Sequence, residues 1–68
     1  MIKNLGDFLL DIRIEAGLTQ RELASLVGTY PTSISQYERD INCPKVYTFE
    51  DILNACGYEL VIKKKGSK

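Results

Sequence analysis

The chain has 68 residues, 44% of them hydrophobic and 26% charged, which fits one small globular domain. Such a domain has little room for a catalytic cleft, and the sequence has no histidine, phosphate-cradling glycine loop or nucleophile beside a base, so we expect no enzyme. The formal net charge of zero gives no sign of a polyanionic partner. No apolar run approaches the roughly 18 residues that span a bilayer, so we expect a cytoplasmic protein.

The two cysteines are too few to predict a metal site. Cys43 and Cys56 could hold a structural zinc ion only with help from histidine, which is absent. Cys56 falls on an apolar helical stripe and is interpreted as a small core residue, whereas Cys43 lies in a loop. We therefore expect no metal and no cofactor.

The first predicted helix covers residues 5–16. Asn4 can cap its N-terminus and Gly17 can end it. Its apolar residues recur at spacings of three and four, which predicts one buried stripe. They are Leu5, Phe8, Leu9, Ile12 and Ala16.

The second predicted helix covers residues 20–27 and ends at Gly28. Thr19, followed three residues later by Glu22, is a capping-box pattern. A helix of about eight residues is too short to be stable alone. We therefore expect tertiary packing to hold it, through an apolar stripe formed by Leu23, Leu26 and Val27.

The third predicted helix, residues 31–39, has a mostly uncharged polar surface. Pro31 suits its first position, because the N–H that proline lacks has no helical partner there. Ile34 and Tyr37 point one way, so the buried stripe is narrow. Its other sides carry Thr32, Ser33, Ser35, Gln36 and Arg39.

A loop with turn-forming residues leads to a fourth predicted helix over residues 46–56. Asp40, Asn42 and Pro44 supply the turn chemistry, and Gly57 ends the helix. The expected buried face of this helix consists of Val46, Phe49, Ile52, Leu53 and Cys56.

Residues 58–63 change to an alternating pattern that favours a strand. Tyr58, Leu60 and Ile62 fall on one side, and the sequence has no second strand to pair with them. Either the same segment of a second copy pairs with it across a two-fold axis, or the segment packs on its own domain. The first alternative makes these three residues a dimer interface. Residues 64–68 are expected to be a flexible basic tail.

These elements predict an all-α domain of four helices over residues 1–57, followed by a short strand. The motifs "GLTQRELA" and "SISQYE", joined through Gly28 and followed by Pro44 and "ILNACG", resemble the helix-turn-helix of the Xre and lambdoid phage repressor (Cro/C1-type) family. The similarity covers roughly residues 5–60, and it implies a lambda-repressor-like DNA-binding domain. The ending "GYELVIKKK" is similar to the strand of HipB-type antitoxins and regulators, where it joins two subunits.

Base contacts are expected from the third helix, since the major groove admits one helix with its N-terminal side chains nearest the bases. Gln36 is the strongest candidate, because its amide can pair with adenine N6 and N7 together. Thr32 and Ser33 offer hydroxyls to bases or phosphates, or they act only as capping residues. Ser35 and Arg39 lie at the flanks. The resemblance implies base contacts at Pro31, Thr32 and Gln36, although Pro31 has no donor to offer.

Phosphate contacts are expected at the start of the second helix and in the loop after the third. Gln20 occupies the position that usually meets a phosphate in the family, and Arg21 can join it at this helix N-terminus. Asn42 and Lys45 occupy the loop. The alternatives to these phosphate contacts are that Gln20 is an ordinary surface residue of the helix and that Lys45 is a charge exposed only to solvent.

The resemblance also implies an ion pair between Arg13 and Glu38. An exposed pair would contribute little to stability, about 0–1 kcal/mol.

The charge of the body counts against DNA binding, because residues 1–62 contain five basic and nine acidic side chains. Each subunit could therefore neutralise only a few phosphates, and a dimer with two half-sites compensates for this.

We therefore expect a homodimeric, sequence-specific repressor that reads an inverted repeat in double-stranded DNA, with an antitoxin role as one possibility. The alternative is a protein-interaction module on the same scaffold, whose main partner is a protein such as a toxin.

Overall fold

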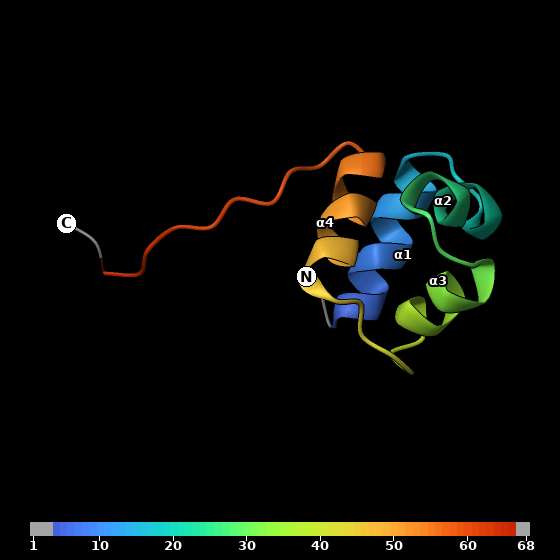
Figure 1. Cartoon of the computed structure of the whole chain (residues 1–68), viewed down its shortest axis with the longest axis horizontal. Coiled ribbons are helices and arrows are strands. Elements are labelled where there is room, and N and C mark those ends of the chain that lie inside the picture. Colours follow the sequence, from blue (N-terminus) through green and yellow to red (C-terminus); the bar gives the residue numbers. More distant parts are fainter. Residues whose placement is uncertain (1–3, 67–68) are drawn as a thin grey trace.

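A computed structural model describes residues 4–66 of the chain. Four helices pack together at one end of an elongated molecule (Figure 1). They are α1 (Leu5–Glu15), α2 (Gln20–Val27), α3 (Pro31–Glu38) and α4 (Val46–Ala55). This confirms the predicted all-α domain with four helices. Residues 1–3 of the predicted domain and residues 67–68 of the predicted basic tail lie outside the described residues.

The predicted N-terminal caps of α1 and α2 are confirmed. The Asn4 side chain accepts a hydrogen bond from the Asp7 backbone N–H at 2.8 Å. At α2, the Thr19 hydroxyl accepts from the Glu22 N–H at 3.0 Å, and the Glu22 carboxylate accepts from the Thr19 N–H at 2.9 Å. Both helices therefore begin where their own side chains satisfy the free N–H groups of the first turn.

One core joins all four helices. Its buried apolar residues are Leu9 and Ile12 from α1, Leu23 and Ala24 from α2, Ile34 from α3, and Ile52 and Leu53 from α4, together with Cys56. The short helices α2 and α3 are thus held by tertiary packing, as expected from their length. Burial raises the pKa of the Cys56 thiol, so this cysteine remains a neutral core residue.

Three residues that the sequence assigned to buried stripes are exposed: Leu26, Val46 and Ala16, the last of which follows the final residue of α1. Leu26 is 63% exposed and Val46 is 65% exposed. The core side of α2 is already occupied by Leu23 and Ala24, so Leu26 lies at the rim of an open groove between α2 and α4. Val46 is the first residue of α4, where the helix has not yet reached the core.

The predicted strand over residues 58–63 is absent from the single chain. After α4, the chain runs away from the four helices without helix or strand over residues 58–64 and turns at residues 65–66 (Figure 1). The expected strand does not form within one chain, because a strand needs a neighbour to pair with, and the described part of the chain contains none. The similarity to the HipB-type strand therefore has no structural support.

The start of this segment packs on its own domain. The Tyr58 hydroxyl donates a hydrogen bond to Glu15 at 2.6 Å, which raises the pKa of the phenol. The Tyr58 and Phe8 rings pack in a T-shaped arrangement with their centroids 6.3 Å apart, and Leu60 contacts the core. Beyond Leu60 the chain leaves the domain, so Val61 and Ile62 are 62% and 82% exposed.

Candidate nucleic-acid interface

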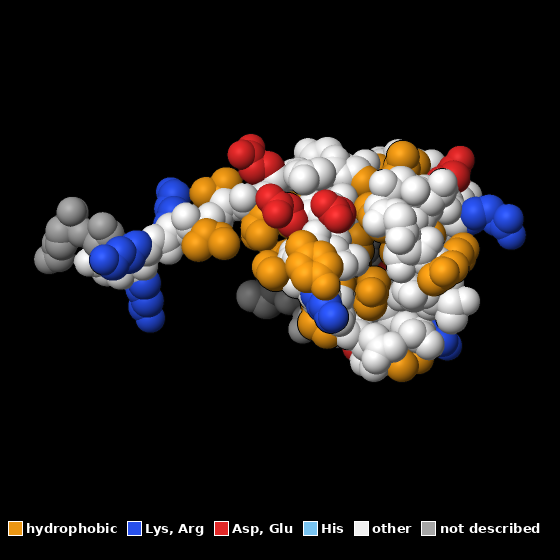
Figure 2. Space-filling model, in the orientation of Figure 1, with side chains coloured by type: hydrophobic (Ala, Val, Ile, Leu, Met, Phe, Trp, Pro, Cys, Tyr) orange, Lys and Arg blue, Asp and Glu red, His pale blue; other side chains and the backbone are white. Residues whose placement is uncertain are grey.

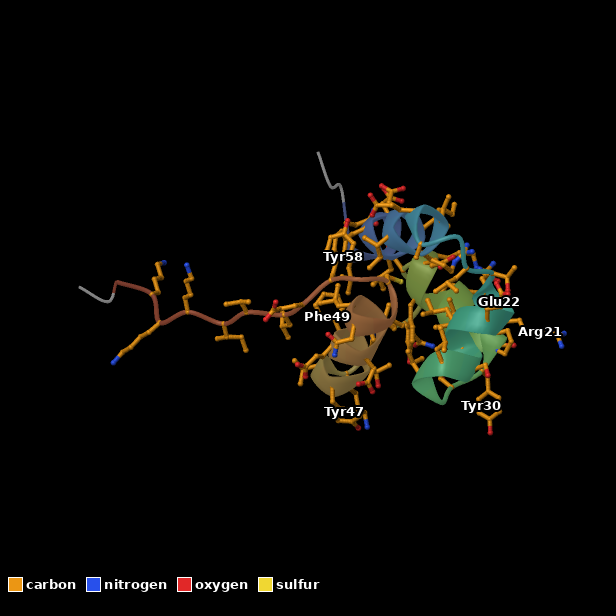
Figure 3. All side chains as sticks on the ribbon, turned by 90° about the horizontal axis from the view of Figure 1, so that it is seen from above. Arg21, Glu22, Tyr30, Tyr47, Phe49 and Tyr58 are labelled. Carbon is orange, nitrogen blue, oxygen red and sulfur yellow. The ribbon has the colours of Figure 1, made fainter. Side chains whose placement is uncertain are left out.

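A tight corner joins α2 to α3. Gly28 ends α2 in the left-handed region, with φ of 73°. The Thr29 N–H then donates to the Ala24 carbonyl at 2.9 Å. Tyr30 precedes α3 in extended conformation and its side chain is 75% exposed, while Pro31 begins the helix. Figure 3 shows Tyr30 pointing away from the body. Glycine is needed at residue 28 because other residues rarely adopt this φ.

The exposed side of α3 is polar. Ile34 and Glu38, one turn apart, are the buried residues of this helix. Thr32 and Arg39 are exposed, and Ser33, Ser35 and Gln36 are partly exposed. By helical geometry Thr32, Gln36 and Arg39 lie opposite the buried residues, with Ser33 and Ser35 at the flanks, and we call these five residues the α3 polar face. No side chain caps the N-terminus of α3, so Thr32 and Ser33 are not engaged as caps.

A buried carboxylate holds α3 against its neighbours. Glu38 accepts hydrogen bonds from Arg13 Nε at 2.6 Å, Arg13 Nη2 at 3.1 Å and Gln20 Nε2 at 3.0 Å. Arg13 also donates to the Leu18 carbonyl at 2.8 Å. The Arg13–Glu38 pair expected from the family resemblance is confirmed, but it is not a surface pair, because the two side chains are only 12% and 5% exposed. This cluster fixes the position of α3 relative to α1 and α2.

Gln20 and Arg21, the two phosphate candidates of α2, have different surroundings. The Gln20 amide donates to Glu38, so this side chain has a structural partner that the sequence did not reveal. Arg21 is exposed and extends away from the body at the same end of the molecule as Tyr30 (Figure 3). Arg21 is therefore the freer of the two to reach a phosphate.

The turn after α3 is anchored to the start of α1. Asp40 adopts a left-handed conformation with φ of 58°, which is uncommon for a residue other than glycine. Its carboxylate accepts a hydrogen bond from the Gly6 N–H at 3.1 Å, at the N-terminus of α1, where negative charge is favourable. A Cβ at Gly6 would lie 2.5 Å from the Glu38 carbonyl oxygen. The sequence indicates a turn role for Asp40 but gives no sign of either contact.

Two of the predicted DNA-contacting residues contact each other. The Asn42 side-chain N–H donates to the Gln36 carbonyl oxygen Oε1 at 2.7 Å. Lys45, the remaining candidate of this loop, is exposed and precedes α4 without capping it through its side chain. The structure therefore brings Asn42 to the α3 polar face, next to Gln36.

Positive charge is sparse around this surface. Arg21, Arg39 and Lys45 are exposed on the body, while Lys63, Lys64 and Lys65 lie along the extended segment. Figure 2 shows these tail cations away from the body and acidic groups over α4. Within residues 4–66, no group of side chains has the composition of a metal site. None of the helices in that range is long and apolar enough to cross a membrane.

Comparison with known proteins assigns the chain to a family. Residues 9–62 match the model of a helix-turn-helix family, HTH_3, which covers α2, the Gly28 corner and α3. The chain belongs to this family of Cro/C1-type (Xre) helix-turn-helix domains. It is a DNA-binding and non-catalytic family. No curated protein matches the chain.

Proposed function

We propose that the protein is a homodimeric transcriptional repressor that inserts α3 into the major groove of an inverted-repeat operator. The observation that carries this proposal is the α3 polar face, which is uncharged apart from Arg39 and is fixed from behind by the buried Glu38 cluster. A surface meant only for solubility usually carries more charge. Donor and acceptor groups held at a fixed angle are what base recognition requires.

In this proposal the side chains divide into two groups. Gln36 and Thr32 contact base edges, with Ser33 and Ser35 beside them. Arg21, Arg39 and Lys45 contact phosphates, which set the register without reading sequence. Gln20 supports the interface mainly by holding Glu38, since its amide already donates to that carboxylate.

The function is tested by electrophoretic mobility shift of the full chain on DNA from immediately upstream of its gene, at about 50 and 200 mM salt. We expect a shift that is strongest at low salt, with a footprint of two half-sites whose centres lie roughly 34–36 Å apart. A folded protein that shifts no DNA at the lower salt concentration refutes the proposal.

Two variants separate base contact from phosphate contact. Gln36→Ala is expected to cost about 1–3 kcal/mol of discrimination at one base position per half-site. Arg21→Ala, the matched control, is expected to weaken binding to all sequences alike and to reduce the salt slope by about one. Competition binding against single-base operator variants measures both. If Gln36→Ala loses the same amount of affinity for every operator variant, Gln36 does not read a base.

The dimer is proposed to form through the segment after α4, with Tyr58, Leu60 and Ile62 at or near the contact. The exposed apolar side chains of Val61 and Ile62 support this, because they leave the domain without covering. A second copy can supply the missing strand neighbour.

Replacing Val61 and Ile62 together with serine tests the dimer. We expect the double variant to sediment as a monomer and to lose at least tenfold in operator affinity, because each half-site is then bound alone. Lys63→Ser and Lys64→Ser, which leave the apolar residues in place, are the control and should still dimerise. A serine variant that remains dimeric by analytical ultracentrifugation rejects this contact.

The second candidate function is binding of a protein partner, such as a toxin. The exposed Leu26 beside the open groove between α2 and α4, together with the acidic body, favours it. If the protein is folded but does not bind DNA, binding of a protein partner becomes the better proposal.

A further inference from the structure

We propose that the groove between α2 and α4 binds the C-terminal segment of a second copy of this chain, residues 61–64, with Val61 and Ile62 seated between the two helices. This inference rests on the proposed homodimer and names the surface that receives the segment. Its starting observation is that one chain carries both an open groove with an apolar wall and an apolar segment that nothing covers.

The groove has an apolar wall and a polar rim. Leu26 and Val27 line it from the last turn of α2, and Ala55 lines it from the end of α4. The rim carries Asp51 and Asn54, which are both exposed. The space of about 510 Å³ is of the size that holds a small ligand or a few side chains. Leu26 therefore has room beside it for an apolar partner.

The rim of the groove favours a cation. Asp51 supplies a carboxylate, and both helices end at the groove, α2 at Val27 and α4 at Ala55. Helix C-termini carry partial negative charge, which a basic residue in the last turn complements. Neither helix has a basic residue there. Within residues 4–66 the ion pair is Arg13–Glu38, so Asp51 is paired with no described cation of its own chain.

The C-terminal segment has the complementary pattern. Val61 and Ile62 are exposed, and lysines follow directly at positions 63–65. In extended form, residues 61–64 span about 13 Å at about 3.3 Å per residue. The stretch of α4 from Asp51 to Ala55 is about 6 Å long at about 1.5 Å per residue. The segment is therefore long enough to place its apolar pair on the groove wall and a lysine at the rim.

The segment is directed away from the groove of its own chain. Tyr58 holds its start on α1, because the hydroxyl donates to Glu15 at 2.6 Å and the ring packs on Phe8. Leu60 adds a contact with the core. From there the segment runs away from α2, which forms one wall of the groove (Figure 1). Its apolar residues are therefore placed to meet another copy.

A second copy satisfies both surfaces at once. Each chain contributes one segment and one groove, so two copies related by a two-fold axis cover both segments and fill both grooves. Burial of the apolar pair provides most of the affinity. The lysines mainly fix the direction of the segment, since exposed ion pairs contribute little. Direct pairing of the two segments as strands is the other way to form a dimer, and the experiment separates the two arrangements.

Disulfide crosslinking between two cysteine variants identifies what the segment contacts. One variant carries Leu26→Cys and the other Ile62→Cys, both with Cys43→Ser to remove the exposed native thiol, while Cys56 is buried. After the full-length chains are mixed and mildly oxidised, we expect intact mass to show mainly dimers that join residue 26 of one variant to residue 62 of the other. Dimers that mainly join two Ile62→Cys chains would show that the segments pair with each other, which overturns the inference.

A chain that carries both Leu26→Cys and Ile62→Cys tests the groove of the same chain. We expect it to crosslink between copies, so a monomer with an internal disulfide at low protein concentration overturns the inference. Ser25→Cys is the matched control for Leu26→Cys, because residue 25 is exposed on α2 but does not line the groove. Mixed with Ile62→Cys, it should crosslink far less.

Substitutions in the groove measure its contribution to the dimer by analytical ultracentrifugation. Leu26→Glu should raise the dissociation constant of the dimer at least tenfold, because a carboxylate would have to leave water beside Val61 and Ile62. Asp51→Asn should raise it about two- to fivefold, and less at high salt. Glu50→Gln, which removes an exposed carboxylate of α4 outside the groove, should change it less than Asp51→Asn does. Unchanged dissociation constants in both groove variants, with unchanged circular dichroism melts, overturn the inference.

The possible results separate this inference from the function on which it rests. A folded chain that shifts no DNA but forms the crosslink between residues 26 and 62 refutes the repressor and supports the groove contact. A wild-type dimer that binds its operator without this crosslink overturns the inference and leaves the repressor in place. A wild-type chain that stays monomeric removes the homodimer that both require.

Discussion

Replacing Glu38 with alanine is expected to lower the free energy of unfolding by about 3–5 kcal/mol, the usual cost of removing one partner of a buried ion pair. The carboxylate accepts two hydrogen bonds from Arg13 and one from Gln20, and its side chain is 5% exposed. Without it the Arg13 charge stays largely buried, with only the Leu18 carbonyl as a partner. A domain of this size has roughly 3–10 kcal/mol of stability in total, so the variant is expected to be largely unfolded near 37 °C.

Urea denaturation followed by circular dichroism measures this loss. Glu50→Ala removes an exposed carboxylate from α4 and should change stability by no more than about 0.5 kcal/mol. Glu38→Gln should fall between the two variants, because an amide oxygen still accepts from Arg13. Equal midpoints for Glu38→Ala and Glu50→Ala would mean that the cluster contributes nothing to holding α3.

The substitution Gly6→Ala is expected to destabilise the domain by about 1–3 kcal/mol, although alanine is normally the better helix former by about 1 kcal/mol. The new methyl group would lie 2.5 Å from the Glu38 carbonyl oxygen and 2.7 Å from Asp40 Oδ2. The first of these atoms belongs to the backbone of α3 and cannot turn aside. The change therefore forces α1 and α3 apart at the point where the Asp40 turn is anchored.

Thermal unfolding of three variants tests this explanation. Ser25→Ala, at an exposed position of α2, serves as the control and should be neutral or slightly stabilising. The double variant with Gly6→Ala and Asp40→Gly removes the side-chain clash but not the clash with the carbonyl, so it should remain less stable than wild type. A melting temperature that rises in Gly6→Ala shows that the two helices can separate at no cost.

Much of the fold follows from local sequence patterns. Asn4, Thr19 with Glu22, Gly28 and Pro31 each act within a few residues, and the structure has each in its expected place. Such signals are readable because the partner atoms lie in the same turn of chain. The Arg13–Glu38 pair is separated by 25 positions and came only from the family resemblance.

The features that sequence analysis missed depend on segments far apart in the chain. The contact between Gly6 and Asp40 spans 34 positions, and a helical glycine or a loop aspartate gives no sign of it alone. The burial of Glu38 and the use of Gln20 as its partner also require three helices to meet. Residues 58–63 have a strand pattern, but no strand forms in the single chain, because nothing among the described residues pairs with them.

The placement of charge has a consequence for how such a protein locates its target in a chromosome. A genome offers on the order of 10⁶–10⁹ competing positions, and proteins rich in phosphate contacts are retained on them. With few exposed cations on the body, each random encounter should be brief. In the proposed repressor, a small number of molecules would then suffice to keep one control region occupied, because few of them are sequestered elsewhere.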